Sequence, residues 1–123
     1  MDEAAIWSEL GPRGFRLLVA AFYRRIPGDE LLGPMYPSED LGGSEDRLYD
    51  FLCFRFGGVP RYLEERGHPR LRMRHRPFRI GEVERDRWLE LMGAAMVEAE
   101  VPPPVAAPLG EFFAQVADFM RNT

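Results

Sequence analysis

Apolar residues recur at helical spacing along most of this chain, while proline and glycine divide the pattern into separate segments. No stretch shows the alternation typical of a β-strand, and no internal repeat is present. We therefore predict an all-α fold in which two N-terminal and two longer C-terminal helices pack around a shared centre. The apolar positions of three of these helices are Phe15, Leu18, Val19, Phe22 and Ile26; Val83, Trp88, Leu91, Met92, Ala95 and Met96; and Val105, Leu109, Phe112, Phe113, Val116 and Met120.

The remaining helix is expected to begin at Ser44 and to end near Phe56. Serine is a favoured N-cap residue, and two acidic residues follow it where the helix dipole favours negative charge. At about 100° per residue, one face of this helix has two apolar residues between two arginines. Such a face suits a flat apolar ligand with acidic groups at its edge. It is formed by Ser44, Arg47, Leu48, Phe51 and Arg55.

Both histidines and six of the arginines lie between residues 66 and 80. Pro69 and Pro77 exclude a long helix here, because proline breaks a helix interior. Any helix that holds His75 must therefore be short, which suits the presentation of a single imidazole. The plain alternative is a basic surface loop with an ordinary exposed histidine.

Composition narrows the class of protein. With 123 residues and a net charge of −4, the chain fits one globular domain, and its acidity argues against a general nucleic-acid binder. Cys53 is the only cysteine, so an internal disulfide and a thiolate metal cage are excluded, and we interpret it as a buried inert thiol. The sequence has no membrane-span pattern and no signal-peptide pattern, which favours a cytoplasmic protein. An arginine-rich RNA-binding helical domain is a remote alternative.

Several motifs occur in a specific order: Phe22-Tyr23, Tyr36-Pro37, Gly57-Gly58, the segment from Gly67 to His75-Arg76-Pro77-Phe78, and Trp88. This series resembles the truncated haemoglobins, most closely their second group, across roughly residues 8–120. The resemblance implies a two-over-two helical sandwich, a shortened globin fold with a haem between the helix pairs. Gly11-Pro12 departs from the pattern, since a Gly-Gly pair is expected there, and the packing of the first helix is left open.

The resemblance also implies roles for particular residues. His75 would be the proximal ligand of the haem iron, and His68 is the rival candidate. The haem would be haem b, held non-covalently, because the chain has no Cys-x-x-Cys-His motif. Tyr23, Tyr36 and Trp88 would line the distal side as hydrogen-bond donors, although spacing alone would place Tyr23 and Trp88 as core aromatics. The other residues expected against the haem are Ser44, Arg47, Leu48, Phe51, Tyr62, Arg66, Arg74, Phe78 and Met92, with Arg47 and Arg74 nearest the propionates.

Three donors around one diatomic ligand would slow its release, which suits chemistry on the ligand better than transport. The implied function is reversible dioxygen binding linked to redox chemistry of oxygen, nitric oxide or peroxide. Turnover as a nitric oxide dioxygenase or a peroxidase would need electrons from an external reductase. A non-catalytic sensor or carrier of the same fold is the open alternative.

Overall fold

The computed structural model describes residues 2–36, 38–67, 75 and 78–123, without the side chains of residues 63 and 66. All regular secondary structure in these ranges is helical, which confirms the predicted all-α class. The elements are α1 (Glu3–Arg24), η1 (Gly33–Met35), η2 (Ser38–Asp40), α2 (Leu41–Gly57), α3 (Arg61–Arg66), α5 (Glu82–Glu98) and α6 (Pro103–Phe119).

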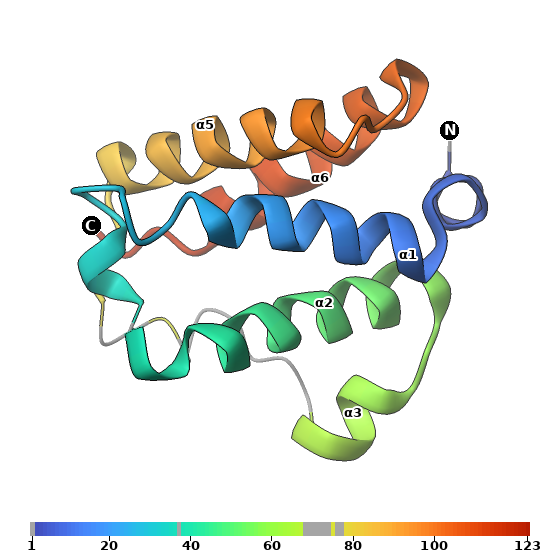
Figure 1. Ribbon diagram of the computed structural model, residues 1–123, viewed down its shortest axis with the longest axis horizontal. Helices are drawn as coiled ribbons and strands as arrows, with labels where there is room; N and C mark the ends of the chain where they lie inside the picture. The colour runs from blue at the N-terminus through green and yellow to red at the C-terminus, as the bar shows by residue number, and fades with distance from the viewer. Residues whose placement is uncertain (1, 37, 68–74, 76–77) are drawn as a thin grey trace.

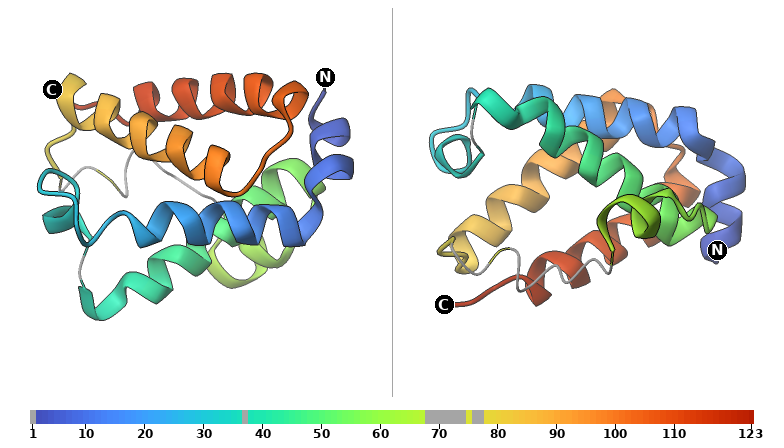
Figure 2. Two further views of the ribbon diagram at one scale, coloured as in Figure 1. Left: turned by 45° about the horizontal axis from the view of Figure 1, so that its top comes forward. Right: turned by 90° about the horizontal axis from the view of Figure 1, so that it is seen from below.

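Helix α1 lies between two groups of helices (Figure 1). Helix α2 runs antiparallel to α1 on one side, and α5 and α6 form an antiparallel pair on the other. Figure 2 shows the same pairs from two further directions, with α3 beside the end of α2 and the two termini at opposite ends of the molecule. The four long helices thus form the predicted two pairs.

The apolar stripe of α1 contacts both groups. Phe15 is completely buried and stacks on Phe56 of α2, with ring centroids 5.4 Å apart. Further along α1 the stripe faces α5, and the rings of Phe22 and Trp88 lie 5.1 Å apart. Because aromatic contacts join α1 to both groups, α1 holds the two groups of helices in fixed positions.

Helix α1 begins well before the predicted stripe. Gly11 has φ 61° and ψ −177°, so the helix is divided there, and Pro12 begins the second segment, where a missing N–H costs nothing. The first segment packs on the core: Ile6 is buried, and Trp7 stacks on Phe15 at 5.9 Å. The substitution of Gly-Pro for Gly-Gly is therefore compatible with a packed first segment.

The predicted start of α2 was wrong. The helix begins at Leu41, with Asp40 at the N-cap position, and Ser44 lies inside it. The error arose at Gly42-Gly43, which is helical here rather than part of a turn. The predicted end was correct, because Gly58 adopts a left-handed conformation with φ 66° just after Gly57.

The predicted inner face of α5 was wrong at its first residue. Val83 is 65% exposed, whereas Met92 and Ala95 are completely buried. The packed face repeats at intervals of about four residues through Glu84 and Trp88, so Val83 lies roughly 100° away from it. Because Glu84, in the first turn of this face, is polar, the apolar pattern alone did not show which side of the helix packs.

Gly57 and Gly93 give a matched test of the packing of the first segment. A Cβ at Gly57 would lie 2.5 Å from Cε2 of Trp7, whereas one at Gly93 would meet nothing within 4 Å. We expect Gly57→Ala to lower the free energy of unfolding by about 1–3 kcal/mol through overpacking. Gly93→Ala should raise it by about 0.5–1 kcal/mol through helix propensity. Urea unfolding measures both, and equal effects would contradict the close Trp7–Gly57 contact.

Candidate functional site

A cavity of about 420 Å³ lies among α1, α2, α5 and α6. This volume falls within the range of sites for small molecules and cofactors, roughly 300–1,000 Å³. Its walls are mainly aromatic and aliphatic, with a few polar groups. The predicted site residues that line it are Tyr23, Tyr36, Ser44, Arg47, Leu48, Phe51, Tyr62, His75, Phe78 and Trp88.

Other predicted residues lie elsewhere. Met92 is completely buried in the helical core and does not line the cavity. Arg55, predicted on the same face as Arg47, instead pairs with Glu3 of α1 and lies 5.4 Å from the ring centroid of Phe112. His68, Arg74, the segment bounded by Pro69 and Pro77, and the side chain of Arg66 lie outside the described residues.

The cavity also has walls that the sequence did not assign to it. The stripe of α6 was predicted as an apolar face, but nothing in its spacing indicated that the face borders a cavity. Two charged residues at the start of α5 carried no signal at all. The additional lining residues are Leu32, Met35, Asp40, Leu52, Ile80, Glu84, Arg85, Phe112, Phe113, Ala117 and Met120. Val116, interpreted from the sequence as core or haem-wall packing, also lines the cavity.

Tyr23, Tyr36 and Trp88 form a cluster on the cavity wall. The rings of Tyr23 and Tyr36 meet edge to face at 5.7 Å, and Phe22 contacts both Tyr23 and Trp88. The Trp88 indole N–H faces the Tyr36 hydroxyl as a hydrogen-bond donor and lowers the pKa of that phenol. Since an indole N–H can only donate, this bond leaves the Tyr36 O–H available as a donor.

Burial keeps both tyrosines of this cluster protonated. It raises the pKa of Tyr36, and the hydrogen bond from Trp88 opposes that shift. Burial also raises the pKa of Tyr23, and the nearby Tyr36 raises it further, while Arg47 acts in the opposite direction. At neutral pH the cavity therefore presents two phenolic O–H groups, each able to donate one hydrogen bond.

Asp29 connects the segment that carries Tyr36 to the helix that carries Trp88. Its carboxylate accepts hydrogen bonds from the backbone N–H groups of Leu31 and Leu32, at 3.2 and 2.8 Å. The same carboxylate lies 3.4 Å from Nε of Arg87, the residue before Trp88. Because this ion pair spans two elements, it contributes to the relative placement of the two donors.

Arg47 supplies the positive charge on the α2 side of the cavity. Its guanidinium donates to the Asp40 carboxylate at 2.8 Å and to Ser44 Oγ at 3.0 Å. All three residues line the cavity. A cation held in this way could pair with an acidic group of a ligand.

His75 lines the cavity and is partly exposed. Its carbonyl oxygen accepts a hydrogen bond from the Phe78 N–H at 3.0 Å. Among the described residues, no group of three or more His, Cys, Asp or Glu side chains could hold a bare metal ion. A single imidazole instead suits a metal whose other ligands come from a cofactor.

The profile of the bacterial-like globins matches residues 5–122. The chain belongs to the bacterial-like globins. A group 2 truncated haemoglobin of Bacillus subtilis is 41% identical over 92 residues, which cover 75% of this chain and 69% of the relative. A two-on-two haemoglobin of Arabidopsis thaliana is 30% identical over 123 residues, which cover 98% of this chain and 70% of the relative.

Solved globin structures share the fold. The haemoglobin of Thermobifida fusca gives a TM-score of 0.90 at 44% identity, covering 96% of this chain and 97% of that chain. The haemoglobin of Chloroflexus aurantiacus gives 0.89 at 44% identity, covering 96% of this chain and 98% of that chain. These matches confirm the two-over-two globin fold and the resemblance to group 2 truncated haemoglobins. Membership of the globin family implies a haem cofactor and the binding of diatomic ligands.

The residues of this globin fit a haem. Its cavity combines aromatic and aliphatic walls with one imidazole and two arginines, Arg47 and Arg85. The walls suit a flat apolar ring, the imidazole suits an iron ligand, and the arginines suit an acidic edge. No helix in the described ranges is long and apolar enough to cross a membrane.

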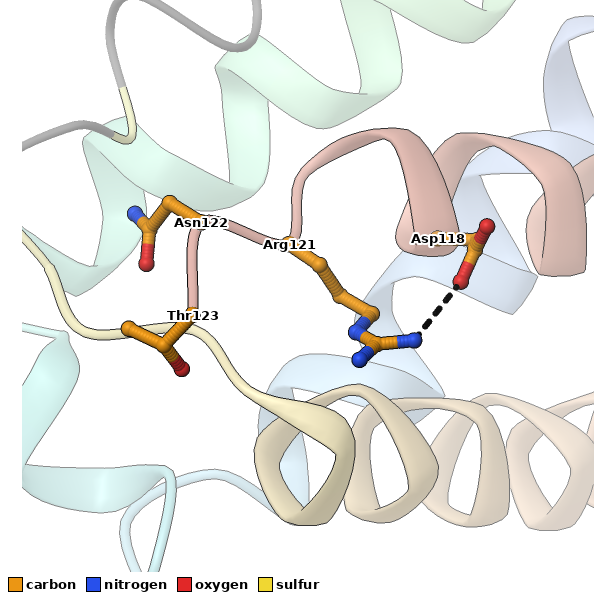
Figure 3. A pocket seen from close by; sticks show the side chains of 4 residues that line it. All are labelled: Asp118, Arg121, Asn122 and Thr123. Carbon is orange, nitrogen blue, oxygen red and sulfur yellow. Dashed lines mark hydrogen bonds and ion pairs between the residues drawn. The ribbon is translucent and has the colours of Figure 1, made fainter.

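A separate hollow of about 340 Å³ lies at the end of α6 (Figure 3). It is lined by Asp118, Arg121, Asn122 and Thr123, none of which is a predicted site residue.

The raised tyrosine pKa values predict an alkaline loss of stability. The unfolded chain releases its tyrosine protons near pH 10, whereas folded Tyr23 and Tyr36 keep theirs, so the free energy of unfolding falls as pH rises above about 10. Below that pH the contribution is fully present. We expect Tyr23→Phe and Tyr36→Phe to make this fall less steep.

Urea unfolding at a series of pH values between about 8 and 11 measures the slope. Tyr49 also has a raised pKa, but it is present in the wild type and in both variants, so the difference isolates the cavity tyrosines. Identical slopes in the three proteins would show that the two hydroxyls are not held in their protonated form.

Proposed function

We propose that this globin binds haem b non-covalently in the cavity, with His75 as the proximal iron ligand, and that it binds dioxygen reversibly. The observation that carries the proposal is one imidazole in the wall of an apolar cavity that also contains the Tyr23, Tyr36 and Trp88 cluster. When bound, haem supplies a ferrous iron with a coordination position for a diatomic ligand.

The remaining lining residues would hold the cofactor. Leu48, Phe51, Tyr62 and Phe78 provide apolar contact area with the ring, and Arg47 is the cation proposed to pair with a propionate. That pairing would compete with the existing contact between Arg47 and Asp40. Arg66 and Arg74 are further candidates for the second propionate, and Met92 would support the wall from behind, since it is completely buried.

The hydroxyls of Tyr23 and Tyr36 and the indole N–H of Trp88 would donate hydrogen bonds to the diatomic ligand. Two observations support this role: burial keeps both phenols protonated, and Trp88 faces the Tyr36 hydroxyl as a donor. A related globin structure, at 35% identity and a TM-score of 0.89, is that of an oxygen-avid truncated haemoglobin of Bacillus subtilis. Retention of the ligand favours redox chemistry of oxygen, nitric oxide or peroxide, with an external reductase as electron donor.

A comparison of the two histidines tests the proposed ligand. We expect the wild type to take up haem and to give a five-coordinate ferrous spectrum, because one imidazole is available on the proximal side. His75→Ala should lose that spectrum, and His68→Ala should keep it. Absorption spectra before and after reduction measure the difference. A wild type that takes up no haem, or a retained spectrum in His75→Ala, would contradict the assignment.

The donor assignment is tested separately by ligand release. Each lost hydrogen bond of about 1.4 kcal/mol corresponds to a tenfold change, so Tyr36→Phe, Tyr23→Phe and Trp88→Leu should each change the oxygen off-rate by about tenfold. Tyr49→Phe is the matched control, because Tyr49 does not line the cavity. Stopped-flow mixing with a competing ligand measures the rates. Wild-type rates in all three cavity variants would refute the role of the donors.

Consumption of nitric oxide with an added reductant separates redox chemistry from a sensor or carrier. A redox enzyme should consume nitric oxide over many turnovers, whereas a sensor or carrier should stop after one.

A further inference from the structure

The residues after α6 are hydrogen-bonded to the segment that follows His75. The Asn122 side chain uses both polar atoms of its amide. Oδ1 accepts a hydrogen bond from the Ile80 N–H at 2.9 Å, and Nδ2 donates one to the Phe78 carbonyl at 2.6 Å. The Asn122 backbone N–H also donates to the Ile80 carbonyl at 2.8 Å. Asn122 is thus hydrogen-bonded to the N–H and the carbonyl of Ile80 and to the carbonyl of Phe78.

This segment is part of the cavity wall. Phe78 and Ile80 line the cavity, and Ile80 is only 7% exposed. The Phe78 N–H donates to the carbonyl of His75, and the Phe78 carbonyl accepts from Asn122, so Phe78 links the two residues. The contact is therefore a connection between the end of α6 and the backbone of His75.

Thr123 also lies close to this segment. A Cβ at Gly81 would lie 2.8 Å from Thr123 Oγ1, and the Gly81 N–H donates to Glu84 Oε1 at 2.7 Å. The backbone at Gly81 thus lies close to both Thr123 and the first turn of α5.

The end of α6 provides a fixed base for this contact. Asp118 pairs with Arg85 of α5 at 2.7 Å and with Arg121 at 3.4 Å. In Figure 3 the Asn122 and Arg121 side chains extend to opposite sides of the chain, so these ion pairs and the amide contacts do not compete. Asn122 therefore projects from an end that is already joined to α5.

We propose that Asn122 is a positioning residue, which holds the backbone that bears His75 against the end of α6 and so sets the placement of the imidazole at the cavity. The link to haem rests on the proposed function of His75. Asparagine suits this position because a single side chain must donate to one backbone carbonyl and accept from one backbone N–H. Neither leucine nor aspartate of similar size can do both.

Two variants and one control test the proposal. Asn122→Ala removes both side-chain bonds, whereas Asn122→Asp keeps an acceptor for the Ile80 N–H but cannot donate to the Phe78 carbonyl. Thr123→Ala is the control, because its backbone N–H to the Ile80 carbonyl is retained. All three should keep the wild-type helical circular dichroism, since only exposed residues after α6 are changed.

Hydrogen exchange at the Ile80 amide reads the contact directly in the haem-free chain. Exchange should be about tenfold faster in Asn122→Ala, intermediate in Asn122→Asp, and unchanged in Thr123→Ala. The His75 ring signals in NMR spectra of the same haem-free samples should shift or broaden in Asn122→Ala, to a smaller extent in Asn122→Asp, and not in Thr123→Ala. In the haem-loaded protein, the iron–histidine stretching band should shift, and transfer of haem to an acceptor globin should be severalfold faster.

Unchanged Ile80 exchange in Asn122→Ala would refute the contact. Faster exchange with wild-type His75 ring signals would refute the positioning role and leave only a structural one. If the wild type takes up no haem, the proposed function fails, but the exchange and ring-signal measurements on the haem-free chain still decide the role of Asn122.

Discussion

The packing of α1 between α2 and the α5–α6 pair is the interaction on which the rest of the structure depends. Phe15 joins α1 to Phe56 of α2, and Phe22 joins it to Trp88 of α5. Tyr23 follows Phe22 directly and lies about 100° further around the helix, which turns it from the core toward the cavity. The same contact that stabilises the helix pairs therefore places two members of the candidate site.

The two sides of the cavity are built in different ways. Tyr23 and Trp88 belong to long helices, and Tyr36 is held near them through the contacts of Asp29 with its neighbouring backbone and with Arg87. On the histidine side, the described contacts include the hydrogen bond from the Phe78 N–H to the His75 carbonyl and the bonds of Asn122 to Phe78 and Ile80. These bonds join the segment after His75 to the end of α6, so a long-range contact contributes to this side of the cavity.

The helices were predictable from the sequence because burial imposes a period on apolar residues, as in the stripe from Phe15 to Phe22. The prediction failed where polar residues occupy the packed face, as at Glu84, or where glycines continue a helix, as before Ser44. Tyr23 and Trp88 look like ordinary core aromatics by spacing, and only the resemblance to a family gave them a role. Asp29–Arg87 and Asn122–Ile80 were not predictable, since pairs of polar groups far apart in the chain carry no periodic signal.

The direction of one hydrogen bond changes how the donor cluster works. The sequence suggested three independent donors, but the Trp88 indole also faces the Tyr36 hydroxyl as a donor. A hydroxyl that accepts a hydrogen bond becomes a better donor, because a chain of hydrogen bonds polarises its members. Under the proposed function, Trp88 would therefore act on a ligand through Tyr36 as well as directly. Tyr36 is the central member of the cluster, because it contacts Tyr23 at one side and Trp88 at the other. Since the indole N–H can only donate, the Tyr36 O–H would be the donor toward a ligand.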